Sequence, residues 1–223
     1  MKLYRDYRRP SDMPKALPLF PLGGGSLLLP RRPIQLTVFE PRYLEMLDDA
    51  LAGERLIGVI QPVADDESES ESPELFPVGC AGRIVQYAEI GDKRCFLTLM
   101  GVARFRVARE LAAATRYRSV VADYADFADD FTEGLGESAV DRKAVVDALR
   151  EFAEANKVGV DWDDIEKASN ETLVNALAMM SPYGTREKQA LLEARDLKSR
   201  AEILVAIAQV ELARNPDAPQ LLH

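Results

Sequence analysis

The stretch Ala103-Arg-Phe-Arg-Val107 decides the fold class of this chain. Its three apolar residues alternate with Arg104 and Arg106, and a period of two is that of a β-strand with one face on a core and the other in water. We therefore predict a strand here, with the apolar side chains buried and both arginines facing solvent.

Similar short runs lie on both sides of this strand. They cover residues 36–39, 56–61, 82–90, 94–100 and 118–124. The segment Ile90-Gly-Asp-Lys93 joins two of them and has the glycine and aspartate typical of a hairpin turn. Many short strands separated by tight turns favour a barrel or sandwich over a βαβ sheet.

One helix is predicted among these strands. Pro41 suits the first position of a helix, and Tyr43, Leu44, Leu47 and Leu51 follow at helical spacing. The helix should end at the glycine that follows, residue 53.

From about residue 137 the pattern changes to helices. Val145, Leu149 and Phe152 form one apolar stripe of an amphipathic helix, and Asp161 and Asn170 are predicted N-caps of the next two. Further helices are predicted at 187–194 and 197–213, and the acidic, glycine-containing link 126–136 is interpreted as a hinge or spacer. We thus predict an α+β chain, with a β-rich domain at 14–126 and a helical bundle at 137–213.

Composition excludes several classes of protein. Apolar residues make up 47 % of the 223 residues and charged residues 29 %, as in a globular chain. The net charge of −9 makes nucleic acid a poor default partner. The sequence has no apolar run of the roughly 18 residues that span a membrane, and no apolar segment follows its basic start, so we expect a cytoplasmic protein without a membrane partner. The acidic run 65–74 is predicted to be a solvated loop.

Groups that carry chemistry are scarce. The only histidine is the last residue, His223, and no P-loop motif occurs. Cys80 and Cys95 do not have the spacing of a zinc clip and are interpreted as reduced thiols in strands or core. We therefore expect no catalytic residue, no cofactor and no metal.

Several ordered segments strongly resemble the amino-terminal domain of Lon proteases, particularly its stand-alone bacterial relatives. The resemblance spans about 14–213, and its segments are Leu17-Pro-Leu-Phe-Pro-Leu22, Leu27-Leu-Leu-Pro30, Leu36-Thr-Val-Phe-Glu-Pro-Arg-Tyr43, Leu56-Ile-Gly-Val-Ile60, Val78-Gly-Cys-Ala-Gly-Arg-Ile84, Leu97-Thr-Leu-Met-Gly-Val-Ala-Arg-Phe-Arg-Val107 and Glu187-Lys-Gln-Ala-Leu-Leu-Glu-Ala-Arg-Asp196.

The resemblance implies a PUA-like β pseudobarrel followed by a helical bundle. In full-length Lon this part recognises unfolded or tagged protein substrates, while separate ATPase and Ser-Lys peptidase parts unfold and cleave them. The chain ends where those parts would begin, so the expectation is a non-catalytic module that binds unfolded or extended polypeptide, as an adaptor or regulator in protein quality control. A protease or chaperone is the expected partner, and the sequence sets no oligomeric state.

Six residues near the resembling motifs are candidates for peptide binding: Phe20, Leu27, Leu28, Phe39, Arg42 and Tyr43. The first interpretation of Arg42 and Tyr43 is a structural corner between strand and helix, and that of Phe20 and the two leucines is core. Direct contact with a peptide is the alternative.

Binding of RNA or a small ligand is the competing hypothesis, because PUA-like barrels also occur in RNA-related proteins. Residues 1–32 carry seven basic side chains against two acidic ones and form a local positive arm. Such binding would weaken steeply with added salt.

Overall fold

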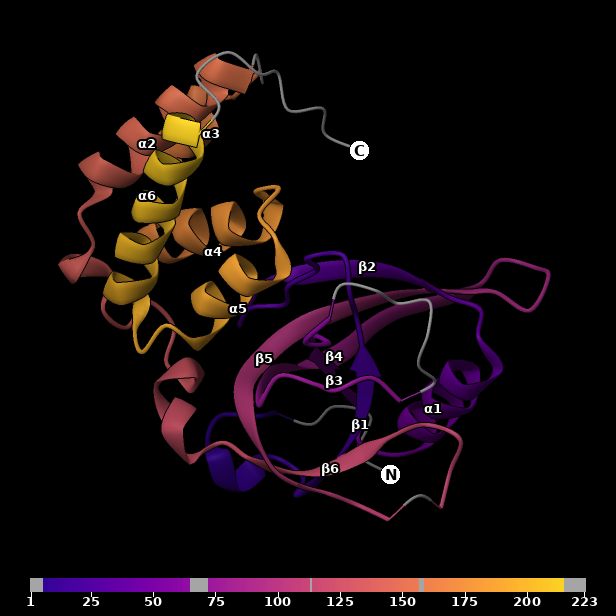
Figure 1. Cartoon of the computed structure of the whole chain (residues 1–223). Helices are drawn as coiled ribbons and strands as arrows, with labels where there is room; N and C mark the ends of the chain where they lie inside the picture. The colour runs from indigo at the N-terminus through magenta and orange to yellow at the C-terminus, as the bar shows by residue number, and fades with distance from the viewer. Residues whose placement is uncertain (1–5, 65–71, 113, 157–158, 215–223) are drawn as a thin grey trace. The chain divides into compact units, whose positions relative to one another are not determined.

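The structure is a computed structural model that describes residues 6–64, 72–112, 114–156 and 159–214. It divides into two compact units, Met1–Glu133 and Gly134–His223, which we call the β unit and the helical unit (Figure 1). The acidic run 65–74 lies largely outside the described residues, as does the tail from residue 215. No described helix is long and apolar enough to cross a membrane.

The described part of the β unit contains six strands, one α-helix and two short 3-10 helices. Their bounds are η1 Pro10–Asp12, β1 Ala16–Pro21, β2 Pro33–Val38, α1 Pro41–Ala52, β3 Leu56–Ile60, β4 Val78–Glu89, β5 Cys95–Glu110, β6 Ser119–Asp123 and η2 Ala125–Phe131. Pro41 opens α1 and Gly53 caps its end, as predicted.

The strands form one sheet in the order β2-β5-β4-β3-β1-β6, and β5 also pairs with β6. This second pairing closes five of the strands into a barrel, and β2 extends the sheet from the other end of β5 (Figure 1). Only β1 and β3 are parallel; the other pairs are antiparallel. The predicted α+β fold with a pseudobarrel is confirmed.

Strand β5 is longer than the sequence pattern indicated. The runs at 94–100 and 103–107 form one strand of 16 residues, and its pairing with β4 contains register shifts after Ala81 and Ile84. Bulges increase the twist of a sheet. One part of β5 can therefore pair with β4 and β6 in the barrel, while its other part pairs with β4 and β2. The barrel core contains Leu17, Leu19 and Phe105, none of them exposed.

The alternation along β5 does not hold for Arg104, which is buried while Arg106 is exposed. Arg104 Nη2 lies 2.7 Å from Asp130 Oδ1, and its backbone N–H donates to Asp130 Oδ2 over 2.9 Å. Its guanidinium also lies 4.6 Å from the centroid of the Phe127 ring. The prediction that Arg104 faces solvent is therefore wrong. The first part of the link 126–136 lies in η2, which packs on β5.

Within its described residues, the helical unit contains five α-helices and one short 3-10 helix. They are η3 Glu137–Ala139, α2 Arg142–Asn156, α3 Trp162–Lys167, α4 Asn170–Met180, α5 Thr185–Glu193 and α6 Leu197–Arg214. Asp161 caps α3 as predicted, accepting from the N–H groups of Asp163 and Asp164. The cap of α4 is Ser169 rather than the predicted Asn170, because the Ser169 hydroxyl accepts from the Thr172 N–H.

Buried polar side chains tie these helices together. Arg200 donates to the Leu191 carbonyl and to Asn175 Oδ1, over 2.9 and 2.8 Å. Lys188 Nζ donates to the carbonyls of Ala178 and Met179 at the end of α4, over 2.9 and 2.7 Å. Lys188 thus supplies donors to carbonyls that the helix itself leaves unbonded.

We expect the stability of the helical unit to rise between pH 8 and pH 10 because of Lys188. Burial lowers the pKa of Lys188 to about 8, whereas an unfolded lysine titrates near pH ~10.4. In that window the unfolded chain binds more protons, so the free energy of unfolding should increase with pH, by about 1 to 2 kcal/mol. Urea unfolding followed by the fluorescence of Trp162, the only tryptophan, measures this.

The matched control is Lys188→Met, which has no group to titrate at this position. Its unfolding free energy is lower overall because the α4 carbonyls lose their donor. Its profile between pH 8 and pH 10 should be flatter than that of the wild type. Equal slopes in the two proteins would contradict this account.

Candidate functional site

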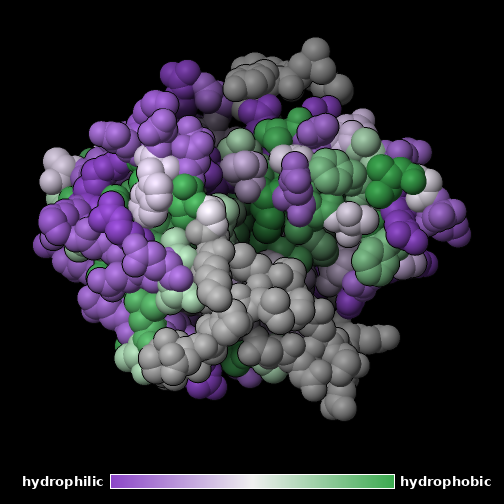
Figure 2. Space-filling view, turned by 90° about the horizontal axis from the view of Figure 1, so that it is seen from above, coloured by the Kyte–Doolittle hydropathy of each residue, from purple (hydrophilic) through white to green (hydrophobic). Residues whose placement is uncertain are grey.

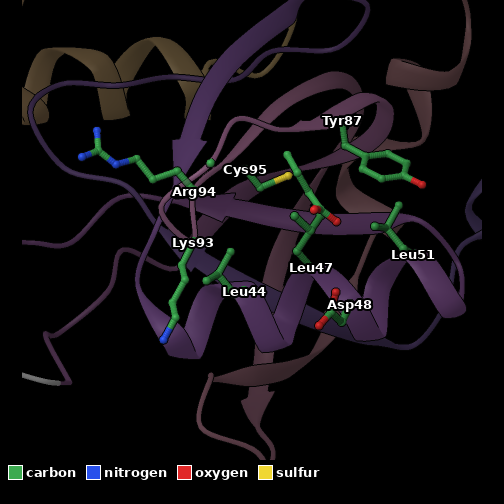
Figure 3. Close-up of a pocket in the computed structure, with 10 residues that line it drawn as sticks. Leu44, Leu47, Asp48, Leu51, Tyr87, Lys93, Arg94 and Cys95 are labelled. Carbon is green, nitrogen blue, oxygen red and sulfur yellow. The ribbon is translucent and has the colours of Figure 1, made fainter.

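A groove between α1 and the β4–β5 hairpin is the candidate site of the β unit. It encloses about 280 Å³. Its lining residues are Leu44, Leu47, Asp48 and Leu51 from α1, Tyr87 and Glu89 from β4, Gly91, Lys93 and Arg94 from the turn, and Cys95 from β5 (Figure 3). We call it the α1–hairpin groove.

The α1 wall owes its position to the two faces of the helix. The leucines at helical spacing face the groove, whereas polar residues on α1 bind the segment between β5 and β6. Tyr117 donates to Asp49 Oδ2 over 2.7 Å, and Arg116 lies 3.6 Å from Glu45. Burial, followed by the bond to Asp49, raises the pKa of Tyr117 to about 12, so the hydroxyl remains a donor at neutral pH.

The opposite wall is the end of the β4–β5 hairpin. Ile90 N–H donates to the Arg94 carbonyl over 3.0 Å, and the turn between them has positive φ at Gly91, Asp92 and Lys93. Val85, Tyr87 and Ile90 on this ribbon are 52, 51 and 55 % exposed. Several large apolar side chains exposed on one hairpin are typical of an interaction surface.

The groove is adjacent to a strand edge without a strand partner. Strand β3 pairs with β4 only as far as Arg83, and the Ile84 N–H donates to the Arg55 carbonyl over 2.9 Å. Beyond that point, no other described strand pairs with the outer edge of β4. An extended peptide could therefore add main-chain hydrogen bonds beside the apolar groove.

Cys95 lies in the floor of the groove and is buried. Burial is the main cause that raises the pKa of its thiol, with smaller contributions from Glu89 and Asp48. The thiol is therefore protonated at neutral pH and behaves as a small apolar group. Cys80 in β4 and Cys95 in β5 are both buried and not joined in a disulfide, in line with the prediction of thiols in strands or core.

Comparison with known proteins assigns the chain to a family. Residues 16–209 match the family described as ATP-dependent protease La (LON) substrate-binding domain. The chain belongs to the Lon substrate-binding domain family.

Curated Lon relatives match nearly the whole chain. Lon protease 2 of Sorangium cellulosum is 27 % identical over 210 residues, which cover 92 % of this chain and 26 % of the relative. The peroxisomal Lon protease homolog 2 of Danio rerio is 28 % identical over 211 residues, with coverage of 85 and 24 %. The Lon-like chain thus spans about a quarter of the length of these curated relatives.

Solved structures agree on the fold. A Lon N-terminal domain protein from Xanthomonas campestris is 26 % identical with a TM-score of 0.55, and the match covers 86 % of this chain and 97 % of that one. The N-terminal domain of a Mycobacterium avium complex Lon protease has a TM-score of 0.62 at 17 % identity, with coverage of 87 and 98 %.

The Lon-type fold separates the six residues predicted for peptide binding into buried and exposed ones. Phe20, Leu27, Leu28 and Tyr43 are buried, Arg42 is half-buried and Phe39 is 62 % exposed. The rings of Phe20 and Tyr43 meet edge to face at 4.6 Å, and the Arg42 guanidinium lies 4.6 Å from the Tyr43 ring centroid while it pairs with Glu40 at 2.8 Å. None of the six lines the α1–hairpin groove. A peptide-binding role for them stays a prediction.

The groove residues that sequence reasoning missed come from elements that it predicted separately. The helix with Leu44, Leu47 and Leu51 and the turn after Ile90 were both predicted, but nothing in the sequence places one beside the other. The apolar side chains of Val85 and Tyr87, two residues apart near a hairpin turn, were the available signal.

A second hollow of about 270 Å³ lies in the helical unit between α2 and α6. Its lining is dominated by alanines, together with Lys198, Glu202 and Asp141. No strand edge or aromatic side chain borders it among the lining residues. Among the described residues, no group of three or more His, Cys, Asp or Glu side chains is placed to hold a metal ion.

Proposed function

We propose that this chain is a non-catalytic recognition module that binds unfolded or extended polypeptide in the α1–hairpin groove. Its membership in a family described as a protease substrate-binding domain supports a substrate-recognition role. Two features together support this location: an apolar groove, and the outer edge of β4 beyond Arg83, with which no described strand pairs. The groove can bind the side chains of a peptide, and the strand edge can form hydrogen bonds with its main chain whatever its sequence.

The exposed surface is consistent with a binding module. Hydrophobic side chains reach the surface among hydrophilic ones, as the green atoms in Figure 2 show for one face. On the β unit the large exposed apolar residues include Phe39, Val85, Tyr87 and Ile90. Three of these four lie on or beside the hairpin that forms the groove.

The cellular part of the proposal is an adaptor or regulator in protein quality control. The module would hold unfolded segments and present them to a protease or chaperone, since the proposal assigns it no catalysis of its own. We place it in the cytoplasm, where Cys80 and Cys95 would stay reduced.

The RNA alternative is less well supported by the described part of the basic arm. Arg8 and Arg9 pair with Asp6 and Asp12 at 2.6 and 3.1 Å. The guanidinium of Arg31 donates to the Asp130 carbonyl inside the β unit. Basic groups committed to such contacts contribute less to attracting a phosphate backbone.

We expect Tyr87→Ser to weaken the binding of an unfolded polypeptide about tenfold. Tyr87 lines the groove and is half exposed, and tyrosine is enriched among the interface residues whose truncation costs more than about 1 kcal/mol. The measurement is a fluorescence anisotropy titration. The ligand is a protein whose disulfides have been reduced and whose thiols have been alkylated, so that it cannot refold. Single-stranded RNA serves as the second ligand.

Two matched variants complete this experiment. Met180→Ser removes an apolar side chain that is 76 % exposed in the helical unit and should leave affinity unchanged. Phe39→Ser tests the most exposed of the sequence-predicted residues. The proposed function is overturned if the wild type does not bind the polypeptide, or if it binds only RNA in a salt-sensitive way. The assignment to the groove is overturned if Phe39→Ser loses affinity for the polypeptide while Tyr87→Ser keeps full affinity.

A further inference from the structure

Charged side chains are distributed unevenly around the α1–hairpin groove. Asp48 on α1 and Glu89 on β4 line it from its two walls, and both are exposed. Both contribute to raising the pKa of Cys95, which indicates that both carboxylates lie near the floor. No described side chain forms an ion pair with either of them, so their charge is available to a ligand.

The basic side chains lie at one end. Figure 3 shows Lys93 beside Leu44, the Arg94 side chain extending outward from the same end, and Tyr87 beside Leu51 at the other end of the helix wall. Both bases are exposed, and neither forms an ion pair with a described acid. The groove therefore has a basic end, a pair of carboxylates along its walls and an aromatic end.

The size of the groove limits what it can contact. Leu44 and Leu51 are seven positions apart on α1, which corresponds to roughly 10 Å along a helix axis. An extended chain advances about 3.3 Å per residue, so about three or four residues fit along this wall. Charges two or three residues apart in a ligand can thus face the basic end and the carboxylates at the same time.

We infer that the groove discriminates among unfolded segments by charge pattern: it favours a short extended segment with an apolar side chain, a basic residue facing Asp48 and Glu89, and an acidic residue facing Lys93 and Arg94. This inference rests on the proposed function and adds a substrate class to it. The apolar contacts supply affinity, and the charges at the exposed rim select among ligands.

Three peptides of equal length and equal apolar content test the inference. The first carries lysines at its polar positions, the second glutamates and the third glutamines. They are titrated against the full chain and against two double variants, Asp48→Asn/Glu89→Gln and Lys93→Gln/Arg94→Gln. All four replacements concern exposed side chains, so folding should be retained, and circular dichroism checks this.

The expected result is a crossed pattern. Asp48→Asn/Glu89→Gln should weaken the lysine peptide about three- to fivefold and leave the glutamate peptide no weaker. Lys93→Gln/Arg94→Gln should do the reverse, and with either variant the affinity for the glutamine peptide should change less than the affinities for the charged peptides. Raising salt to about 1 M, where the screening length is about 3 Å, should remove these differences.

The outcomes distinguish a failure of the charge selection from a failure of the proposed polypeptide binding. If the glutamine peptide binds and the charged peptides respond equally to both double variants, the charge selection is overturned and the recognition function stands. If none of the three peptides binds the wild type, the proposed function is overturned as well.

Discussion

Asp130→Ala should lower the free energy of unfolding of the β unit by about 3 to 5 kcal/mol. The two partners of this ion pair, Arg104 and Asp130, have side chains that are only 3 and 7 % exposed. Arg104 Nε and Nη2 donate to the carboxylate over 2.8 and 2.7 Å, and the Arg104 backbone N–H donates over 2.9 Å. Without Asp130, the buried guanidinium and the backbone N–H of Arg104 would lose these hydrogen bonds, and the ion pair would be lost with them.

A second ion pair between the same two elements is the control. Arg106 lies two positions further along β5 and pairs with Asp126 of η2 at 3.1 Å, but these side chains are 45 and 63 % exposed. Exposed pairs contribute about 0 to 1 kcal/mol, so Asp126→Ala should have little effect. Urea unfolding followed by near-ultraviolet circular dichroism of the tyrosines measures both variants, since most tyrosines lie in the β unit.

A third variant separates the ion pair from packing. Arg104→Met/Asp130→Ala removes both charges, and methionine fills much of the space beside Phe127. The double variant should be more stable than Asp130→Ala alone, because it no longer buries a guanidinium charge that has lost its carboxylate. If Asp130→Ala and Asp126→Ala lower the free energy of unfolding by the same amount, burial of the Arg104–Asp130 pair does not increase its contribution to stability.

This ion pair also shows what the sequence could not predict. The alternation that predicted β5 is a local property of the sequence. Many such runs together predicted a barrel, which five of the strands form. The burial of Arg104 depends on a carboxylate 26 residues away, in a stretch of mixed acids that resembles any solvated link. Within that stretch, no local pattern distinguishes the buried Asp130 from its exposed neighbour Asp129.

Strand β1 is a second case in which local sequence rules do not predict the structure. Its sequence contains Pro18 and Pro21, which local rules disfavour inside a sheet, and the periodicity did not predict a strand there. The strand nevertheless pairs with β3 on one side and β6 on the other, with Leu17 and Leu19 fully buried. Tertiary burial of those leucines outweighs the two missing N–H donors.

The α1–hairpin groove was unpredictable for a related reason. Its walls are about 40 residues apart in sequence, and only the closed barrel brings α1 beside the end of the hairpin. The family resemblance correctly indicated the Lon substrate-binding domain family. It drew attention to Phe20, Leu27, Leu28 and Tyr43, which are buried, because motifs that resemble a family include residues that maintain its fold as well as residues that bind.

Gly101→Ala should destabilise the β unit by about 3 kcal/mol or more. A Cβ at this position would lie 2.0 Å from the Leu29 carbonyl oxygen and 2.7 Å from its carbonyl carbon. Both are backbone atoms, so no side-chain rotation can relieve the clash, and overpacking of this kind typically costs about 1 to 3 kcal/mol and occasionally more. The segment at Leu29 would have to move away from β5.

That movement would break the contacts that join this segment to the sheet. Arg31 N–H donates to the Gly101 carbonyl over 2.8 Å, and Gly101 N–H donates to the Arg32 carbonyl over 2.9 Å. Residues 27–29 before this point are buried, and β2 and α1 follow it, so the position of the groove wall depends on this attachment. The glycine of the motif quoted at 97–107 thus has a packing reason.

The measurement is thermal and urea unfolding of Gly101→Ala beside Gly159→Ala. Gly159 has no heavy atom within 4 Å of a built Cβ and no positive φ, so its substitution should change stability by no more than about 0.5 kcal/mol. Because β2 and α1 follow the displaced segment, Gly101→Ala should also weaken polypeptide binding under conditions where the variant remains folded. A Gly101→Ala protein as stable as Gly159→Ala would mean that Leu29 does not approach β5 as closely as the structure shows.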